Sequence, residues 1–127
     1  MKTVYLFFLM LVLASCSLTN SSATCTESRG AAIETVVEKP NADSSKHMFD
    51  VAFRVDNGCG ALGSFEQVTM GNVTTIYVIA QYDGCICTQD TPLRTAVYTF
   101  NQSVPGTYTL IFKLAGNNTL SKTVIVP

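Results

Sequence analysis

The sequence predicts an all-β sandwich of about seven strands, exported behind an N-terminal signal. Two observations support this prediction. The chain opens on a short apolar segment, and beyond about residue 27 it consists of short apolar runs separated by turn residues, which is the pattern of short strands joined by turns. No helical periodicity extends beyond a turn or two. The 127 residues correspond to one domain.

Residues 1–15 are predicted to be a signal peptide. Lys2 provides a short positive start, residues 4–13 are uninterruptedly apolar, and the small residues Ala14 and Ser15 follow. A membrane-spanning helix needs roughly 20 apolar residues, so this run is too short to span and has the length of a signal-peptide core.

The sequence Leu-Ala-Ser-Cys at residues 13–16 resembles the lipobox of bacterial lipoproteins. In that motif the small residues fit the signal peptidase, and the cysteine is acylated and becomes the new N-terminus. The resemblance implies lipidation at Cys16 and a membrane-anchored location in a bacterial cell envelope, periplasmic or surface-facing. The alternative is an ordinary signal peptide with a chance cysteine. A single acyl chain anchors a protein only marginally, so stable anchoring needs more than one chain.

Residues 16–26 are predicted to be the lipidated cysteine and a flexible tether, because residues 17–22 are small, polar and without periodicity. Residues 27–127 are predicted to form the sandwich. In residues 47–56, Phe49, Val51, Phe53 and Val55 alternate with polar residues, as in a strand with one buried face. The predicted strands are residues 33–39, 47–56, 65–70, 73–82, 92–100, 107–114 and 120–126.

Seven short strands at this spacing are typical of an antiparallel Greek-key sandwich. The closing segment, residues 100–110 with Val-Pro-Gly-Thr-Tyr at 104–108, resembles the last strands of immunoglobulin-like modules. The resemblance implies that Pro105 and Gly106 form a corner at which Tyr108 packs or hydrogen-bonds. Domains of this kind usually place a disulfide around a Trp, whereas this chain has no Trp.

A second resemblance covers most of the mature chain. The segments Asn-Gly-Cys-Gly at residues 57–60 and Tyr-Asp-Gly-Cys-Ile-Cys-Thr-Gln at residues 82–89, with the Pro-Gly-Thr-Tyr segment, are similar to small lipoproteins of Bacteroidota-type bacteria. The resemblance implies a single immunoglobulin-like sandwich behind a lipid tether. It implies no activity.

Removing Cys16 leaves an even number of cysteines: Cys25, Cys59, Cys85 and Cys87. An exported small domain with an even cysteine count is expected to form disulfides, here with three possible connectivities. We favour bridges from Cys85 and Cys87 outward, one to Cys59 and one to Cys25. A redox dithiol within the Cys-x-Cys pair and a four-thiolate metal site remain as alternatives.

No catalytic constellation, cofactor motif or cluster of basic residues is present. The formal net charge is −1 with basic residues scattered singly, which argues against nucleic acid as a partner. His47 is the single histidine and is predicted to be a solvated surface residue. We therefore expect a protein that is not an enzyme and needs neither cofactor nor metal.

The predicted function is a non-catalytic interaction or structural module that contacts an unknown envelope protein or glycan. Loops on rigid sandwiches often make such contacts, and the candidate binding residues are Asn57, Gly58, Asp83, Gln89 and Asp90. Inhibition of extracellular proteases by a disulfide-braced loop is the alternative, and thiol redox or metal binding is the third.

Tyr77, Ile79 and Ile111 stand at strand positions where polar residues are expected. Either a β-bulge shifts the facing so that the other sheet covers them, or they form an exposed apolar strip for a partner. We favour the first interpretation.

Overall fold

The computed structural model describes residues 24–127, so the predicted signal peptide and Cys16 lie outside the described residues. The described chain forms strands only, and none of its elements is a helix long and apolar enough to cross a membrane. The strands are β1 (Thr26–Lys39), β2 (Lys46–Arg54), β3 (Gly60–Met70), β4 (Val73–Asp83), β5 (Leu93–Asn101), β6 (Gly106–Lys113) and β7 (Thr119–Val126).

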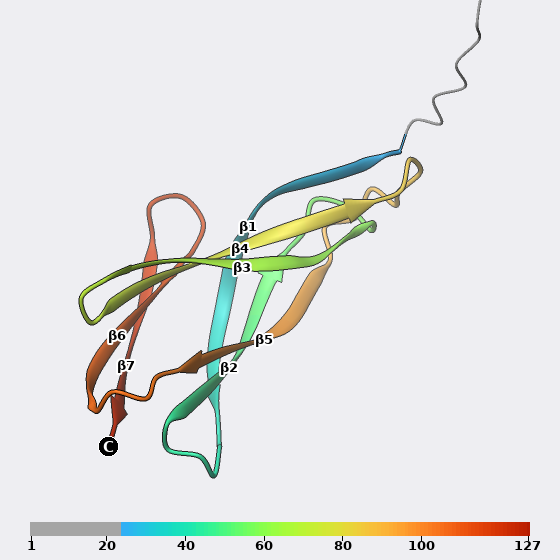
Figure 1. Cartoon of the computed structure of the whole chain (residues 1–127). Coiled ribbons are helices and arrows are strands. Elements are labelled where there is room, and N and C mark those ends of the chain that lie inside the picture. Colours follow the sequence, from blue (N-terminus) through green and yellow to red (C-terminus); the bar gives the residue numbers. More distant parts are fainter. Residues whose placement is uncertain (1–23) are drawn as a thin grey trace, which may run out of the picture.

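The strands form a sandwich in which β1 belongs to both layers (Figure 1). Residues 26–31 of β1 pair with β4, and residues 32–39 pair with β2. The register shifts between Ile33 and Thr35, where the strand passes from one layer to the other. One layer therefore consists of the second half of β1 with β2 and β5, and the other consists of the first half of β1 with β3, β4, β6 and β7. The predicted all-β sandwich is confirmed.

The strand pairings are antiparallel except that of β4 with β6, which is parallel. A single parallel bridge also joins Ile33 of β1 to Leu114, just after β6. The chain leaves β4, runs through β5 in the other layer and returns, so β6 points the same way as β4. Two strands pair along the same edge of β4. Residues 73–76 of β4 pair with β6, and residues 78–83 pair with β1.

The core lies between the two layers, and the alternation that predicted it is confirmed. Phe49, Val51, Phe53 and Val55 are fully buried from β2 and its end. The core is completed by the inward residues of the other strands, among them Ile33, Val36, Ile76, Val78, Ala80, Tyr82, Tyr98, Phe100, Tyr108, Leu110, Phe112, Val124 and Val126.

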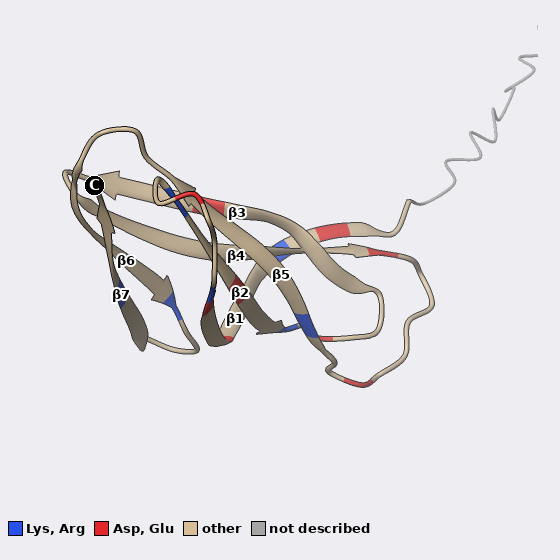
Figure 2. Cartoon of the chain, turned by 90° about the horizontal axis from the view of Figure 1, so that it is seen from below, with Lys and Arg blue, Asp and Glu red and all other residues tan. Residues whose placement is uncertain are grey.

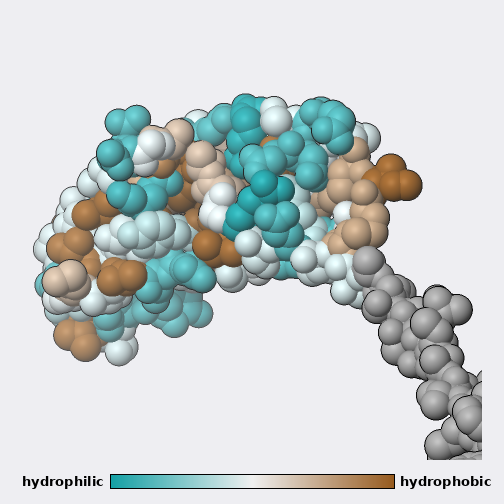
Figure 3. Space-filling model, turned by 90° about the horizontal axis from the view of Figure 1, so that it is seen from above, coloured by the Kyte–Doolittle hydropathy of each residue, from teal (hydrophilic) through white to brown (hydrophobic). Residues whose placement is uncertain are grey.

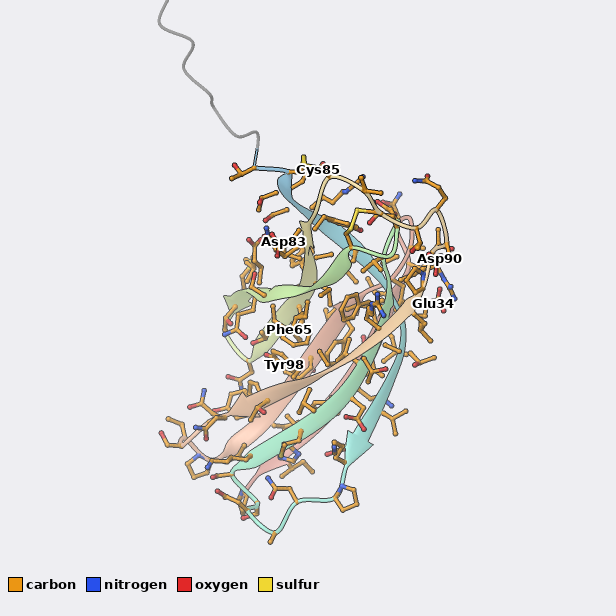
Figure 4. The ribbon with its side chains drawn as sticks, turned by 90° about the vertical axis from the view of Figure 1, so that its right-hand side faces the viewer. Glu34, Phe65, Asp83, Cys85, Asp90 and Tyr98 are labelled. Carbon is orange, nitrogen blue, oxygen red and sulfur yellow. A yellow bond between two sulfur atoms is a disulfide. The ribbon has the colours of Figure 1, made fainter. Side chains whose placement is uncertain are left out.

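Tyr98 ties β5 to the facing layer. Its ring meets Phe65 edge-on at a centroid distance of 5.3 Å (Figure 4) and Phe112 edge-on at 5.8 Å. Its hydroxyl donates to Gln67 Oε1 at 2.7 Å. Burial raises the pKa of Tyr98 to about 12, because ionisation in this setting would leave a poorly solvated charge.

Two strands are longer than the sequence predicted. β1 begins at Thr26 instead of residue 33, and β3 begins at Gly60 instead of residue 65. Both extensions run along β4 and are mainly exposed on both faces. Few of their side chains are buried, so they carry no apolar alternation that a sequence pattern could reveal.

The corner before β6 has the predicted tyrosine contact. The Tyr108 hydroxyl donates a hydrogen bond to the Val104 carbonyl at 2.8 Å, and its ring packs against Phe100 with centroids 5.4 Å apart. The bond fixes the direction in which the chain enters β6.

Replacing Tyr108 by Phe removes this hydrogen bond and keeps the ring packing. We expect the free energy of unfolding to fall by about 1 kcal/mol, the typical net contribution of such a bond. Urea denaturation followed by circular dichroism measures it. The control is Tyr77→Phe, where 36% of the residue is exposed and the loss should be close to zero. Equal losses in both variants would contradict a structural role of the corner.

Candidate functional site

Two disulfides join three segments at the end of the sandwich where the described chain begins. Cys25, just before β1, pairs with Cys85, and Cys59, just before β3, pairs with Cys87. This is the pattern favoured from the sequence, with the two cysteines of the Cys-x-Cys segment bridging outward to different partners. We call this region, residues 24–25, 56–60 and 83–91, the cysteine-braced end.

Backbone hydrogen bonds reinforce the disulfides. The Gly84 N–H donates to the Cys25 carbonyl at 2.9 Å, and the Gly58 N–H donates to the Thr88 carbonyl at 3.0 Å. A Cβ on Gly58 would overlap the Thr88 side chain, so the close approach of the two loops requires glycine at this position.

Arginines tie these loops to the strands beneath. Arg94 donates to the carbonyls of Gly58 and Gly60 at 3.2 Å and 3.0 Å. Arg54 donates to the Thr91 carbonyl at 2.7 Å and also to Glu34 Oε2 at 3.0 Å. The hydrogen bond from Arg54 lowers the pKa of the Glu34 carboxyl below its ordinary value.

A further cluster fixes the start of β1. The Arg29 guanidinium lies 4.4 Å above the centre of the Tyr82 ring and 3.0 Å from Asp56 Oδ2. The Tyr82 hydroxyl accepts a hydrogen bond from the Asp56 N–H at 2.9 Å. The loop at residues 83–91 is therefore held at both ends, by the Tyr82 contacts before it and by the Arg54 hydrogen bond to Thr91 at its end. Between these ends, two disulfides attach it to other segments.

The structure brings the five predicted binding residues to this one end; Figure 4 shows Asp83, Cys85 and Asp90 there. Several of them have internal partners. Asn57 Oδ1 accepts from the Cys59 N–H at 3.0 Å, Asp83 Oδ1 accepts from Gln81 at 3.3 Å, and Gln89 donates to the Cys87 carbonyl at 3.2 Å. These bonds shape the loops. That the residues also bind a partner stays a prediction.

Ile86 is the residue that sequence reasoning missed at this end. It stands between Cys85 and Cys87, and 96% of it is exposed to solvent. Figure 3 shows a hydrophobic protrusion beside the start of the grey segment. The available signal was an apolar residue between two cysteines in a loop of turn residues, since such a residue has no strand face to bury it.

A second surface feature is the outward face of β3, β4, β6 and β7, which we call the outer sheet face. Core residues Ile76, Val78 and Ala80 alternate with Tyr77 and Ile79 along β4, so the latter two point away from the core. The favoured interpretation, in which a bulge hides Tyr77, is wrong, because β4 has regular pairing there and the register shift lies in β3, between Leu62 and Ser64. The exposed apolar residues of this face are Val68, Met70, Val73, Tyr77 and Ile125, with Ile79 and Ile111 half-buried.

The outer sheet face is hollowed where β1 leaves β4 and β6 ends. The groove has a volume of about 350 Å³, with Tyr77 and Ile79 in it, Glu66 and Lys113 beside it, and Gly30 on its wall. A Cβ on Gly30 would meet nothing within 4 Å, so the missing side chain leaves this space open.

The remaining candidates form no site. Across residues 24–127, no group of three or more His, Cys, Asp or Glu side chains is arranged to hold a metal ion. His47 is half-buried, not solvated as predicted, because β2 places it beside β1, where its Nδ1 lies 3.0 Å from Glu38 Oε1.

Replacing Cys59 and Cys87 together by Ser should lower the free energy of unfolding by about 3 to 4 kcal/mol, because the bridge closes a long loop in the unfolded chain. Urea denaturation of the oxidised protein measures this. The matched variant without Cys25 and Cys85, whose sequence separation is 60 instead of 28, should lose slightly more. Unchanged stability in both variants would contradict the bracing role.

Comparison with known proteins agrees with this architecture. The family model named ORF11 beta-sandwich domain matches residues 49–126, from within β2 to the end of β7. No curated protein and no solved structure matches the chain. Since the matched segment is more than half of the 127 residues, the chain belongs to the ORF11 beta-sandwich domain family.

Proposed function

We propose that this chain is a lipid-anchored, non-catalytic module of a bacterial cell envelope that contacts an envelope protein or glycan through its cysteine-braced end. The observation that carries the proposal is Ile86, an aliphatic side chain 96% exposed and flanked by two disulfide-bonded cysteines. A rigid loop that presents an apolar side chain to water is a feature of recognition surfaces.

The physical argument is preorganisation. Binding by a loop costs the conformational entropy of ordering it, and a loop already fixed in its bound shape avoids most of that cost. The disulfides of Cys85 and Cys87, with the Gly58–Thr88 hydrogen bond, hold this loop against two other segments. Ile86 can therefore enter a partner's pocket with little further ordering.

The lipid anchor is supported by the lipobox-like sequence ending at Cys16. Two disulfides are also typical of the oxidising compartments outside the cytoplasm. Eight residues, 17–24, separate Cys16 from Cys25, a span of at most about 30 Å when fully extended. Because the described chain starts at the cysteine-braced end (Figure 1), an anchor at Cys16 keeps this end close to the membrane surface.

Inhibition of extracellular proteases is the second candidate, and the same observation favours it. A protease binds one protruding side chain of a rigid inhibitor loop in its specificity pocket, and Ile86 has this exposure and bracing. Thiol redox chemistry and metal binding are disfavoured, because Cys85 and Cys87 are each disulfide-bonded to a cysteine distant in the sequence.

Incorporating the photo-cross-linker p-benzoylphenylalanine in place of Ile86 tests the contact. In native cells, irradiation should give a covalent adduct at position 86. It should give none at the control position Val104, which is 60% exposed in the turn before β6. The readout is the adduct mass on a denaturing gel, followed by peptide sequencing. Equal labelling at both positions, or none at position 86, would contradict the proposed contact.

The two candidate functions are distinguished by measuring the activity of secreted serine and cysteine proteases in the presence of the purified full chain. The inhibitor function predicts inhibition at micromolar concentration that Ile86→Asp abolishes. The module function predicts no inhibition at that concentration. Inhibition that is unchanged by Ile86→Asp would contradict both proposals, because the protein would then inhibit a protease without using Ile86.

A further inference from the structure

The outer sheet face is unusual because it is almost free of charge. Its outward positions on β3, β4, β6 and β7 are mainly apolar residues, serines and threonines. The charged exceptions are Glu66 on β3, Lys113 on β6 and Asp83, which lies next to Gln81 at the cysteine-braced end of β4. Figure 2 shows how sparse charged positions are on these strands. Among the ion pairs of residues 24–127, none uses Glu66 or Lys113.

These two charges lie symmetrically about β4. Glu66 is paired in register with Tyr77 on one side. On the other side, continuing the β4–β6 register beyond Ile76 and Phe112 places Lys113 beside Tyr77, and all three residues border the same groove. Neighbouring strands are about 4.8 Å apart, so the acidic and basic positions stand roughly equally far from the central strand.

The neighbouring row has the same symmetry. Val68 pairs with Thr75, and Thr75 pairs with Ile111, so an apolar residue flanks β4 on each side. A two-fold axis lying in the plane of contact and running along β4 would place β3 of one copy over β6 of the other. Glu66 would then face Lys113 of the second copy, and Val68 would face its Ile111, each contact occurring twice.

We propose that the outer sheet face binds a second copy of this chain in a two-fold dimer whose axis runs along β4. Such an interface is isologous, and a self-complementary patch is what it requires. Tyr77 lies near the axis and meets its own copy. The two sheets pack face to face, the aligned arrangement common between β-sheets.

The same axis keeps equivalent ends of the two copies together. A rotation about a line parallel to β4 leaves the direction of that strand unchanged, so both cysteine-braced ends point the same way. Two chains anchored through Cys16 would therefore enter one membrane. An axis across the strands would instead put the two chain starts at opposite ends and leave Glu66 facing Glu66.

The size of the face predicts a weak association in dilute solution. The four strands have 8 to 11 residues. At about 3.3 Å per residue and about 4.8 Å between strands, they cover on the order of 600 Å² in plan, less than the ~800 Å² per partner of a standard stable interface. Confinement to one membrane raises the effective concentration and favours the dimer.

The test is a photo-cross-link at the axis combined with charge exchange. With p-benzoylphenylalanine in place of Tyr77, irradiated cells should yield an adduct with the mass of two chains. Glu66→Lys or Lys113→Glu alone replaces two attractive contacts by two repulsive ones and should lower the adduct yield roughly tenfold. The double variant Glu66→Lys/Lys113→Glu restores both pairs and should recover the original yield.

Co-expression of the two single variants with different epitope tags provides a matched control. Their mixed dimer has two attractive pairs, so the adduct should carry both tags. Absence of a two-chain adduct, an adduct with another protein alone, or a yield insensitive to the charge reversals would overturn the proposal. The readout is the adduct mass and not its location, so failure of the dimer is distinguishable from failure of the lipid anchor.

Discussion

The double membership of β1 is the constraint on which the rest of the structure depends. Its first half extends the layer of β4, and after the register shift between Ile33 and Thr35 its second half pairs with β2 in the other layer. Ile33 lies at this crossing and is almost completely buried. Because β1 leaves β4 there, the same edge of β4 is free for β6 further along. The crossing thus closes the core and creates the groove beside Tyr77.

The crossing also separates two surfaces with different chemistry. At one end, the first half of β1 carries Cys25 to the tip of β4, where the disulfides fix the loop that presents Ile86. On the side, β3, β4, β6 and β7 leave a face with few charges, on which Tyr77 lies between Glu66 and Lys113. A partner at the first surface and a second copy at the other would not compete, because one lies at the end of the molecule and the other on its flank.

The sequence was informative wherever burial imposes a period on the residues. The alternation in β2 and β6 identified core residues such as Phe53 and Leu110, and Tyr108 forms the hydrogen bond expected at its corner. The first half of β1 could not be found this way, because its side chains, Glu27 and Arg29 among them, are mainly exposed and show no apolar alternation. Ile86 was missed because exposure depends on which loops the disulfides fix, and a local pattern does not contain that. The burial of Tyr77 was predicted wrongly for a similar reason. The sequence alone does not distinguish an apolar residue that faces the core from one that faces solvent.

An intact mass of the native protein shows at once whether the chain is lipid-anchored and whether its contact end is held by two disulfides. The native protein would be extracted from membranes and weighed with and without reduction and alkylation. The predicted mass begins at Cys16 with its acyl chains, shows no alkylated thiol before reduction, and gains four alkyl groups after reduction, at Cys25, Cys59, Cys85 and Cys87. A chain without lipid would contradict the anchor, and thiols that react before reduction would contradict the braced end.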